Sequence, residues 1–450
     1  MAFVFSTTPS VPQQQQSNGA NGTPLYKTHQ ELKTGLHRDL LNKIDLERLT
    51  TLQDVRARTQ VQAVIYDLIS ASNVPLSSAE RERICREVLH EVFGLGPLEP
   101  LLQDANISDI LVNTHRQVYI ERSGILELTN VVFKDAAHLR HIIDKIVSNV
   151  GRRVDESSPM CDARLDDGSR VNVVIPPLAI DGPILSIRRF GRVPIGVEQL
   201  LAKRSITSPM LELLKGAVKA RLNIIVSGGT GAGKTTLLNV LSSFISERER
   251  VVTIEDSAEL QMQQPHVVRL ECRPPNVEGK GAVRQRELVI NALRMRPDRI
   301  VLGEVRSGEA LDMLQAMNTG HDGSLTTIHA NSPRDAIARL ETLCLMAELN
   351  LPDKAIRQQI ASAVSIIVQV ARLSDGVRRV THISEVIGFA EERVTMQDVF
   401  VFDKQGVGLD GRVLGRFRAT GLRPTFEERL TASGIQLPAN IFDHVSEVER

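Results

Sequence analysis

The sequence predicts an α/β protein whose largest domain has a doubly wound, mostly parallel sheet, and three observations support this fold class. A glycine-rich turn lies between a short apolar strand at 223–227 and a helix that opens at Lys234. Beyond residue 206, apolar strands alternate with helical patterns, which is typical of parallel sheets covered on both faces. Polar clusters follow several of these strands, at the sheet edge where such folds bind their ligands.

The glycine-rich turn matches the pattern Gly-x-x-x-x-Gly-Lys-Thr of phosphate-binding loops. Its glycines allow successive backbone N–H groups to point at an anion, and the following helix N-terminus adds partial positive charge. We expect Lys234 to reach the β- and γ-phosphates and the Thr235 hydroxyl to complete a Mg²⁺ shell. The sequence therefore predicts binding of a nucleoside triphosphate with Mg²⁺. The full loop reads Gly228-Gly229-Thr230-Gly231-Ala232-Gly233-Lys234-Thr235-Thr236.

Composition narrows the class of partners. The chain of 450 residues holds 54 Lys and Arg and 54 Asp and Glu, so its formal net charge is zero. This balance argues against attraction of the whole chain to nucleic acid but leaves a local basic patch open. Trp is absent and aromatic residues make up 3%, which leaves few platforms for stacking single-stranded bases.

The cysteines and the apolar runs indicate in which cellular compartment the protein is expected. The 4 cysteines form no Cys-x-x-Cys pair, so neither a disulfide framework nor a zinc site is expected, and a reducing cytosol fits. No apolar run reaches membrane-spanning length, and the first residues lack the pattern of a signal peptide. We therefore expect a cytoplasmic protein that reaches a membrane only through partners.

Changes of pattern divide the chain into five regions. Residues 1–25, rich in Gln, Pro, Ser and Asn, are predicted to be a disordered tail. Residues 26–95 carry helical apolar stripes and are predicted to be a three-helix bundle. Residues 96–190 are predicted to be a small α/β domain and 191–205 a linker. Residues 206–450 are predicted to be the nucleotide domain, with a C-terminal β-hairpin appendage.

Within the bundle, Ser77 or Ser78 is predicted to cap the third helix, with acidic residues in its first turn. The segment Asn42-Lys43-Ile44-Asp45 has the form of a guanine-reading motif. It precedes the phosphate loop by a whole domain, so we reject that interpretation. The three apolar stripes are Leu32, Leu36 and Leu40; Val61, Val64, Ile65 and Leu68; and Ile84, Val88 and Val92.

The two α/β regions differ in their strand patterns. In the small domain, strands are predicted at 107–112, 118–121, 131–133, 163–165, 171–175 and 185–189, with a helix at 136–150. In the nucleotide domain, strands are predicted at 223–227, 251–254, 300–302, 325–328 and 366–370, helices at 234–246, 284–294, 308–317 and 332–346, and hairpin strands at 394–402 and 412–419. Ser332 is predicted to cap the last of these helices.

Carboxylates follow two of the predicted strands. Transfer of a phosphoryl group to water needs one carboxylate that supports the Mg²⁺ shell and one that orients or deprotonates the attacking water. Glu304, after the strand at 300–302, and Glu255, after the strand at 251–254, are the candidates, with Glu304 favoured as the base. Asp256 and Glu259 are predicted to support the water or the outer ligands of the metal.

A histidine and several arginines complete the candidate site. His329 ends a Thr-rich strand, where it senses the γ-phosphate, relays to a neighbouring residue, or is a structural residue. Negative charge on the transferring phosphoryl group calls for an arginine, and the pattern does not select one. The candidates are Arg164, Arg188 and Arg189 in the small domain and Arg294, Arg296 and Arg306 beside the second strand, of which Arg306 is counted with the nucleotide-binding residues.

Residues 227–343 resemble the type II/IV secretion ATPase superfamily. Besides the phosphate loop, the likeness rests on an aspartate box, Ile254-Glu255-Asp256 through Glu259, and an atypical Walker B, Ile300-Val301-Leu302-Gly303-Glu304. A histidine box, Thr326-Thr327-Ile328-His329-Ala330-Asn331, completes it. Four further stretches, at 151–160, 184–190, 269–276 and 292–299, resemble the CpaF/TadA branch of tight-adherence (Flp, type IVb) pilus motors.

The resemblance implies a cytoplasmic homohexamer that hydrolyses ATP. Each subunit is then expected to have a small α+β (PAS-like) N-terminal domain and a RecA-like motor domain, with ATP between them. Their motion would assemble or retract a pilus through inner-membrane platform proteins. The resemblance also places Arg164 and Arg188 near the γ-phosphate and supports a functional His329.

Three other readings of the motifs stay open. A type IV secretion ATPase that moves protein or DNA shares the same boxes, although the stretches similar to the CpaF/TadA branch argue against it. A RecA-like nucleic-acid motor would share the core, but the neutral charge and scarce aromatic residues disfavour it. A non-catalytic scaffold would use ATP only for assembly. The paired cysteines of zinc-containing secretory relatives are absent.

Overall fold

The structure is a computed structural model that describes residues 35–36, 40, 55–72, 74–122, 124–190, 195–275, 279–347 and 351–448. These residues form two units. One unit takes the described residues up to Asp104 together with Asn130–Lys145, and the other takes Ala105–Thr129 and the described residues from Ile146 onward. The predicted tail at 1–25, Leu32 and the segment at 42–45 lie outside the described residues.

The first unit contains the helices α3 (Val55–Ala71) and α4 (Ser78–Phe93), followed by η1 (Gly96–Leu98) and α5 (Glu99–Gln103). The predicted stripes are buried against each other, since Val61, Ile65, Ile84 and Val88 belong to one apolar cluster that also holds Leu36 and Leu40. Ser77 caps α4 in a capping box with Glu80, as one of the two predicted alternatives. The three-helix bundle as a whole stays a prediction, because most of its first helix is not described.

The second unit begins with a six-stranded antiparallel sheet of order β3-β2-β1-β6-β5-β4. Its strands are β1 (Ile107–Thr114), β2 (Gln117–Arg122), β3 (Ile125–Leu128), β4 (Met160–Arg164), β5 (Arg170–Val174) and β6 (Ile184–Arg188), and the helix α6 (Ala136–Asn149) lies between β3 and β4 in the chain. The prediction of a strand at 131–133 is wrong. The strand of this region is β3, which pairs with β2 after a turn at Gly124, where φ is +85°. Phe133 is buried without a strand partner and contacts the His138 ring edge-on.

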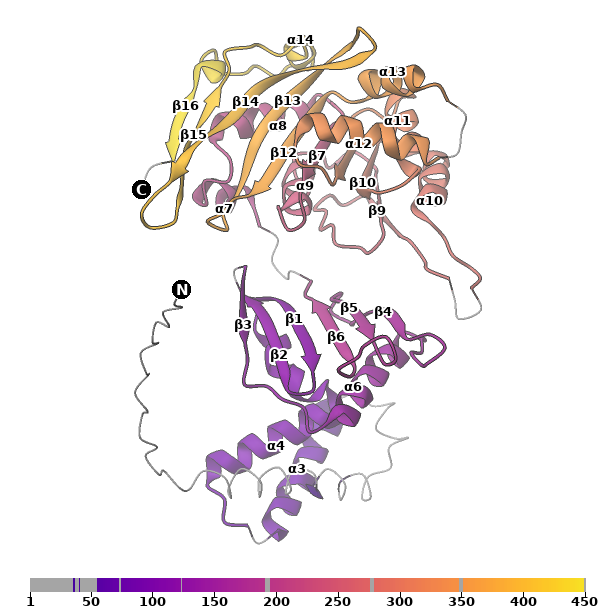
Figure 1. The fold of residues 1–450 in the computed structure, drawn as a ribbon, viewed down its shortest axis with the longest axis vertical. Helices are drawn as coiled ribbons and strands as arrows, with labels where there is room; N and C mark the ends of the chain where they lie inside the picture. The colour runs from indigo at the N-terminus through magenta and orange to yellow at the C-terminus, as the bar shows by residue number, and fades with distance from the viewer. Residues whose placement is uncertain are drawn as a thin grey trace, which may run out of the picture. The chain divides into compact units, whose positions relative to one another are not determined.

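The nucleotide domain contains a ten-stranded sheet of order β16-β15-β14-β13-β12-β7-β11-β10-β8-β9. The pairs from β12 to β9 are parallel, and those from β12 to β16 are antiparallel. Figure 1 shows the antiparallel part in orange and yellow. The strands are β7 (Ile224–Gly228), β8 (Val251–Glu255), β9 (Val267–Glu271), β10 (Arg299–Val305), β11 (Leu325–Ile328), β12 (Ile366–Arg372), β13 (Arg378–Ala390), β14 (Arg393–Val407), β15 (Val413–Ala419) and β16 (Val445–Val448).

The five strands predicted for the parallel core are confirmed as β7, β8, β10, β11 and β12. Several elements were not predicted, among them β9, a half-buried strand at the sheet edge, β13, which is long and mixes polar with apolar residues, β16, and the helices α8 (Ser208–Lys219) and α13 (Asp353–Ala363). Helix α9 ends at Ser242 rather than at residue 246, because the chain turns there. The stretch predicted as a linker, 191–205, contains the helix α7 (Val197–Ala202).

Helices cover both faces of the parallel core. Neighbouring residues of β7 enter different apolar clusters: Ile224 and Val226 pack with α8 and α9, whereas Ile225 packs with α10 to α13. This alternation is the two-residue period of a strand buried on both faces. The helices are α8 (Ser208–Lys219), α9 (Lys234–Ser242), α10 (Gln285–Ala292) with η2 (Leu293–Met295), α11 (Glu309–Asn318), α12 (Pro333–Leu345), α13 (Asp353–Ala363), α14 (Glu427–Ala432) and η3 (Ile441–Asp443).

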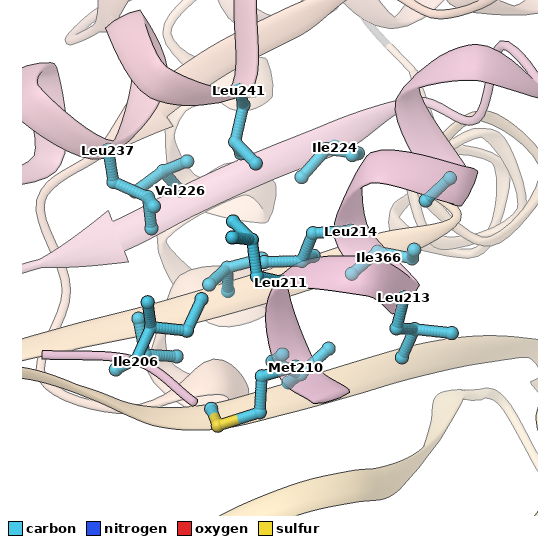
Figure 2. Packing of buried hydrophobic residues seen from close by; sticks show 14 of the residues in the cluster. Ile206, Met210, Leu211, Leu213, Leu214, Ile224, Val226, Leu237, Leu241 and Ile366 are labelled. Carbon is cyan, nitrogen blue, oxygen red and sulfur yellow. The ribbon is translucent and has the colours of Figure 1, made fainter. Parts of the chain in front are cut away.

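Figure 2 shows the first of these clusters, where Leu211 and Leu214 of α8 lie toward the strand β7 with Ile224 and Val226. Leu237 and Leu241 of α9 approach the same strand. Burying a side chain of this size contributes about 1.5–3 kcal/mol. The strand and helix that flank the phosphate loop are therefore fixed by a dry core, which holds the loop in place.

Candidate nucleotide site

The phosphate loop joins the end of β7 to the start of α9. Gly231 and Gly233 have φ of +68° and +99°, a backbone region that favours glycine. At Gly228 a Cβ would lie 2.4 Å from the Val370 carbonyl oxygen, so only glycine allows this approach of β12. The loop turns back on itself through a hydrogen bond of 3.3 Å from the Ala232 N–H to the Gly229 carbonyl.

Lys234 and Glu304 face each other across the site. The Lys234 Nζ lies 3.7 Å from the Glu304 Oε1, and the two side chains are 11% and 20% exposed. Burial lowers the pKa of Lys234, and the nearby Glu304 carboxylate opposes this shift. The strand β10 carries Glu304, and β11 lies between β10 and β7 in the sheet. A parallel sheet thus brings together two residues that are far apart in the chain.

Arg306 links two acidic strand ends. Its Nε and Nη2 donate to the Glu304 Oε2 at 3.0 and 2.8 Å, and its Nη1 donates to the Asp256 Oδ2 at 2.9 Å. The backbone N–H groups of Arg306 and Ser307 donate to the buried Glu309 carboxylate at 2.6 and 2.7 Å, which fixes the turn before α11. The sequence predicted Arg306, Asp256 and Glu304 for this site but not Glu309.

Glu255, at the end of β8, is 3% exposed. Its Oε2 accepts from the Glu259 and Leu260 N–H groups at 2.7 and 2.8 Å. Its Oε1 is buried and has no hydrogen-bond partner among the described residues. Burial raises the pKa of Glu255, against the two backbone donors that lower it. Gly303 makes room for it, since a Cβ there would lie 3.0 Å from the Glu255 Cγ.

His329 follows β11 and is exposed. The strand β11 is fixed to β10 by a hydrogen bond of 2.8 Å from the Thr327 hydroxyl to the Gly303 carbonyl. The Gln369 side chain of β12 donates to the Ala330 carbonyl at 3.2 Å. His329 thus stands on a fixed backbone with its ring open to the cavity.

One cavity of about 400 Å³ brings most of the predicted residues together. A buried carboxylate oxygen without a partner, a threonine in the first helical turn and a carboxylate beside the lysine are oxygen donors of the kind Mg²⁺ prefers. Among the described residues, no group of three or more His, Cys, Asp or Glu side chains forms a metal site by itself. The oxygen donors of the cavity fit Mg²⁺ bound together with phosphate oxygens. The predicted residues that line the cavity are Gly229 to Thr236, Glu255, Asp256, Glu259, Glu304, Arg306, His329 and Arg188.

The arginines of the six-stranded sheet lie in different places. Arg188 lines the cavity of the phosphate loop. Arg164 does not: it donates to the Glu271 carboxylate at 2.8 Å and to the Ser257 hydroxyl at 2.6 Å, and it lines a neighbouring cavity. Arg170, which the sequence did not single out, donates to the Glu259 carboxylate at 3.0 Å and lines the phosphate-loop cavity. Its position on β5 carries no sequence signal that separates it from a surface arginine.

Fold and site define a class of protein: a doubly wound α/β protein with a phosphate-binding loop and an acidic strand end beside its lysine. The chain belongs to the Type II/IV secretion system protein family, whose model matches residues 91–414. This confirms the predicted superfamily, while its CpaF/TadA branch stays a prediction. No helix in the described part of the chain has the length and apolar character needed to cross a membrane.

Relatives and solved structures add particular cases. The chain is 40% identical over 320 residues to a putative conjugal transfer protein of Mycobacterium tuberculosis, which covers 70% of this chain and 90% of that protein. It is 35% identical over 322 residues to the type IV secretion system protein PtlH of Bordetella pertussis, covering 64% and 92%. The VirB11 ATPase of the Brucella suis type IV secretion system is 29% identical, covering 64% and 95%, with a TM-score of 0.35.

Proposed function

We propose that this protein is an ATPase that uses Mg²⁺ and hydrolyses ATP to ADP and phosphate. The observation that carries the proposal is the separation of 3.7 Å between the Lys234 Nζ and the Glu304 Oε1, beside a pre-formed phosphate loop. A lysine at this place binds the β- and γ-phosphates, so a carboxylate next to it stands where the attacking water must be oriented. One cavity contains both groups.

Each residue has a proposed task. The loop N–H groups and Lys234 bind the phosphates, and the Thr235 hydroxyl and Glu304 hold the metal shell. Mg²⁺, when bound with the nucleotide, neutralises developing phosphate charge. Glu304 accepts the proton of the attacking water, and Arg306 holds its carboxylate in position. Glu255 and Asp256 orient the water or the outer ligands. Glu259 positions Arg170. Arg188, which lines the cavity, is a candidate for the γ-phosphate, and Arg164 is a candidate that must first leave the Glu271 carboxylate.

We further propose that the energy of hydrolysis drives a Flp/Tad type IVb pilus. The stretches at 151–160, 184–190, 269–276 and 292–299 support this choice by their likeness to the CpaF/TadA branch. The proposal includes a homohexameric ring in the cytoplasm, with a RecA-like motor domain and a PAS-like N-terminal domain in each subunit. Inner-membrane platform proteins are the proposed partners, and no nucleic-acid partner is proposed.

A second candidate function is a type IV secretion ATPase that moves protein or DNA. The relative names favour it, because one relative is named as a putative conjugal transfer protein and another as a type IV secretion system protein. Both candidates use the same nucleotide site. They differ in the process that stops when the site is inactive.

The test uses the full-length protein in its own host. Replacing Lys234 by Ala removes the phosphate-binding amine, and replacing the exposed Lys404 by Ala is the matched control. The pilus proposal expects the Lys234→Ala strain to lose surface pili in electron micrographs while DNA transfer and protein export continue. Normal piliation of that strain, or loss of transfer with pili intact, would reject the pilus motor, and the second result would support secretion.

A further inference from the structure

The hairpin between β12 and β13 reaches the phosphate loop from the antiparallel part of the sheet. The Nε of Arg378, the first residue of β13, donates to the Gly231 carbonyl at 2.8 Å. The Cδ of the same side chain would lie 3.2 Å from a Cβ at Gly233. Arg378 also lines the cavity that holds Lys234 and Glu304. It therefore bonds the loop at Gly231 and lies close to Gly233, the two loop residues with positive φ.

The hairpin is fixed independently of this contact. The Asp375 carboxylate accepts from the Val377 and Val413 N–H groups, both at 3.0 Å, and pairs with the Arg379 Nη1 at 3.4 Å. The side chains of Asp375 and Arg379 are each 6% exposed, and the Arg379 guanidinium lies 5.3 Å from the Phe402 ring centroid. Successive side chains of a strand point to opposite faces. Anchoring Arg379 in the interior therefore directs Arg378 toward the loop.

The bonded carbonyl belongs to a peptide that shapes the turn of the loop. The Gly231 carbonyl and the Ala232 N–H are two ends of one planar peptide, and this N–H donates to the Gly229 carbonyl at 3.3 Å, so a partner at the oxygen also supports that turn. A charged donor polarises the peptide and makes its N–H a stronger donor in the turn. The loop binds phosphate through its backbone N–H groups, and a loop already held in its bound form spends less binding energy on ordering.

We propose that Arg378 is a positioning residue of the nucleotide site, which holds the Gly231 carbonyl and so keeps the phosphate loop formed for the phosphates of ADP and ATP. This inference rests on the proposed nucleotide binding and adds a residue that no motif of the chain contains. The link also makes the antiparallel part of the sheet a direct neighbour of the bound nucleotide.

The experiment compares Arg378→Met and Arg378→Lys with Arg393→Met, in full-length protein. Arg393 begins the next strand, is exposed, and has no described contact with the loop. Kd for Mg·ADP and Mg·ATP by calorimetry is expected to rise about tenfold in Arg378→Met, equally for both nucleotides within about twofold. Turnover is expected to show a higher KM with kcat changed by less than about twofold, because the loop binds ground and transition states alike. Lysine can donate to the same carbonyl, so Arg378→Lys is expected to recover most of the affinity.

Each other outcome rejects the proposal. Unchanged Kd in Arg378→Met, or an equal loss in Arg393→Met, removes the role of the bond. A loss confined to ATP means that Arg378 acts on the γ-phosphate rather than on the loop. A fall in kcat without a change in KM, or no recovery in Arg378→Lys, also contradicts it. Lys234→Ala separates this inference from the proposed function: if that variant binds Mg·ATP like the wild type, the nucleotide site itself is wrong.

Discussion

Buried charged groups are paired differently at the two ends of the parallel strands. At the edge where the strands begin, Arg299 is fully buried and donates to both oxygens of Glu249, at 2.7 and 3.0 Å. Arg221 adds a third contact to that carboxylate at 3.0 Å, and the Arg299 Nη1 donates to the Gly323 carbonyl at 3.3 Å. Asn223 at the same edge is equally satisfied, since its Oδ1 accepts from two backbone N–H groups and its Nδ2 donates to a carbonyl.

At the edge where the strands end, the charges are incompletely paired. The Glu255 Oε1 is buried without a described partner, and the Lys234 Nζ donates to the Gly229 carbonyl at 3.3 Å but lies 3.7 Å from the Glu304 Oε1, beyond hydrogen-bond distance. Unpaired buried polar groups cost free energy, and a ligand that pairs them recovers it. Arg299, Glu249 and Asn223 are thus paired within the protein and stabilise the fold, whereas Glu255 and Lys234 keep capacity for a further partner, as the proposed nucleotide site requires.

The largest expected effect is on the free energy of unfolding, at the end of the sheet where the parallel strands begin. Arg299→Leu leaves the Glu249 carboxylate with one partner and should lower the free energy of unfolding by about 3–5 kcal/mol. Urea denaturation followed by circular dichroism measures this change, with the exposed Arg393→Leu as the control. The remaining folded protein should bind Mg·ATP with normal affinity. A variant as stable as the wild type would show that this edge does not carry the stability assigned to it.

The second expected effect is on Mg·ATP binding, at the carboxyl ends of the parallel strands. Lys234→Ala removes the amine that binds the phosphates and should weaken Mg·ATP binding at least about a hundredfold. Its thermal stability should change little, because burial already lowers the pKa of this amine and its ion pair with Glu304 is long. Calorimetric titration and thermal melting, with Lys404→Ala as the control, measure both quantities. A large loss of stability with normal binding would reverse the comparison.

A third, smaller effect concerns the pH dependence of Glu255. Because burial raises the pKa of this carboxyl in the folded chain, its contribution to stability is present below its ordinary pKa and is lost as the pH rises through the folded-state pKa. The stability of the wild type relative to Glu255→Gln should therefore fall as the pH rises over that interval. Thermal melts of both proteins over pH 4 to 8 test this sign, and a relative stability that rises with pH would contradict it.

The smallest expected effect is at His329. His329→Ala should lower ATP turnover about tenfold, less than loss of a general base, and leave the melting temperature unchanged because the ring is exposed. Steady-state kinetics and thermal melting measure both. His444 and His115 are both partly buried, so neither serves as a matched control. The wild type with Arg393→Ala as a surface control is therefore the reference. Unchanged turnover would make His329 structural.

Local sequence patterns predicted most of the candidate site residues at the carboxyl ends of the strands, for physical reasons. The phosphate loop needs glycine at Gly231 and Gly233, and the strand that carries Glu304 contains the apolar run Ile300–Leu302, so both features are visible in short windows. Arg170 and Arg378 were missed because their contacts join distant parts of the chain. Arg378 depends on β13, whose mixed polar and apolar residues give no clear period. The strand β3 was misplaced because Ile125, Leu126 and Leu128 are all exposed on a sheet edge.

The most direct test of the account is Mg·ATP binding and turnover by Glu304→Gln. Glu304 is proposed to accept the proton of the attacking water, so the neutral isostere should bind Mg·ATP with an affinity within about threefold of the wild type and lose turnover by about 10²–10⁴-fold. Calorimetry and phosphate release measure the two quantities in the same preparation. Turnover equal to that of the wild type would contradict the account.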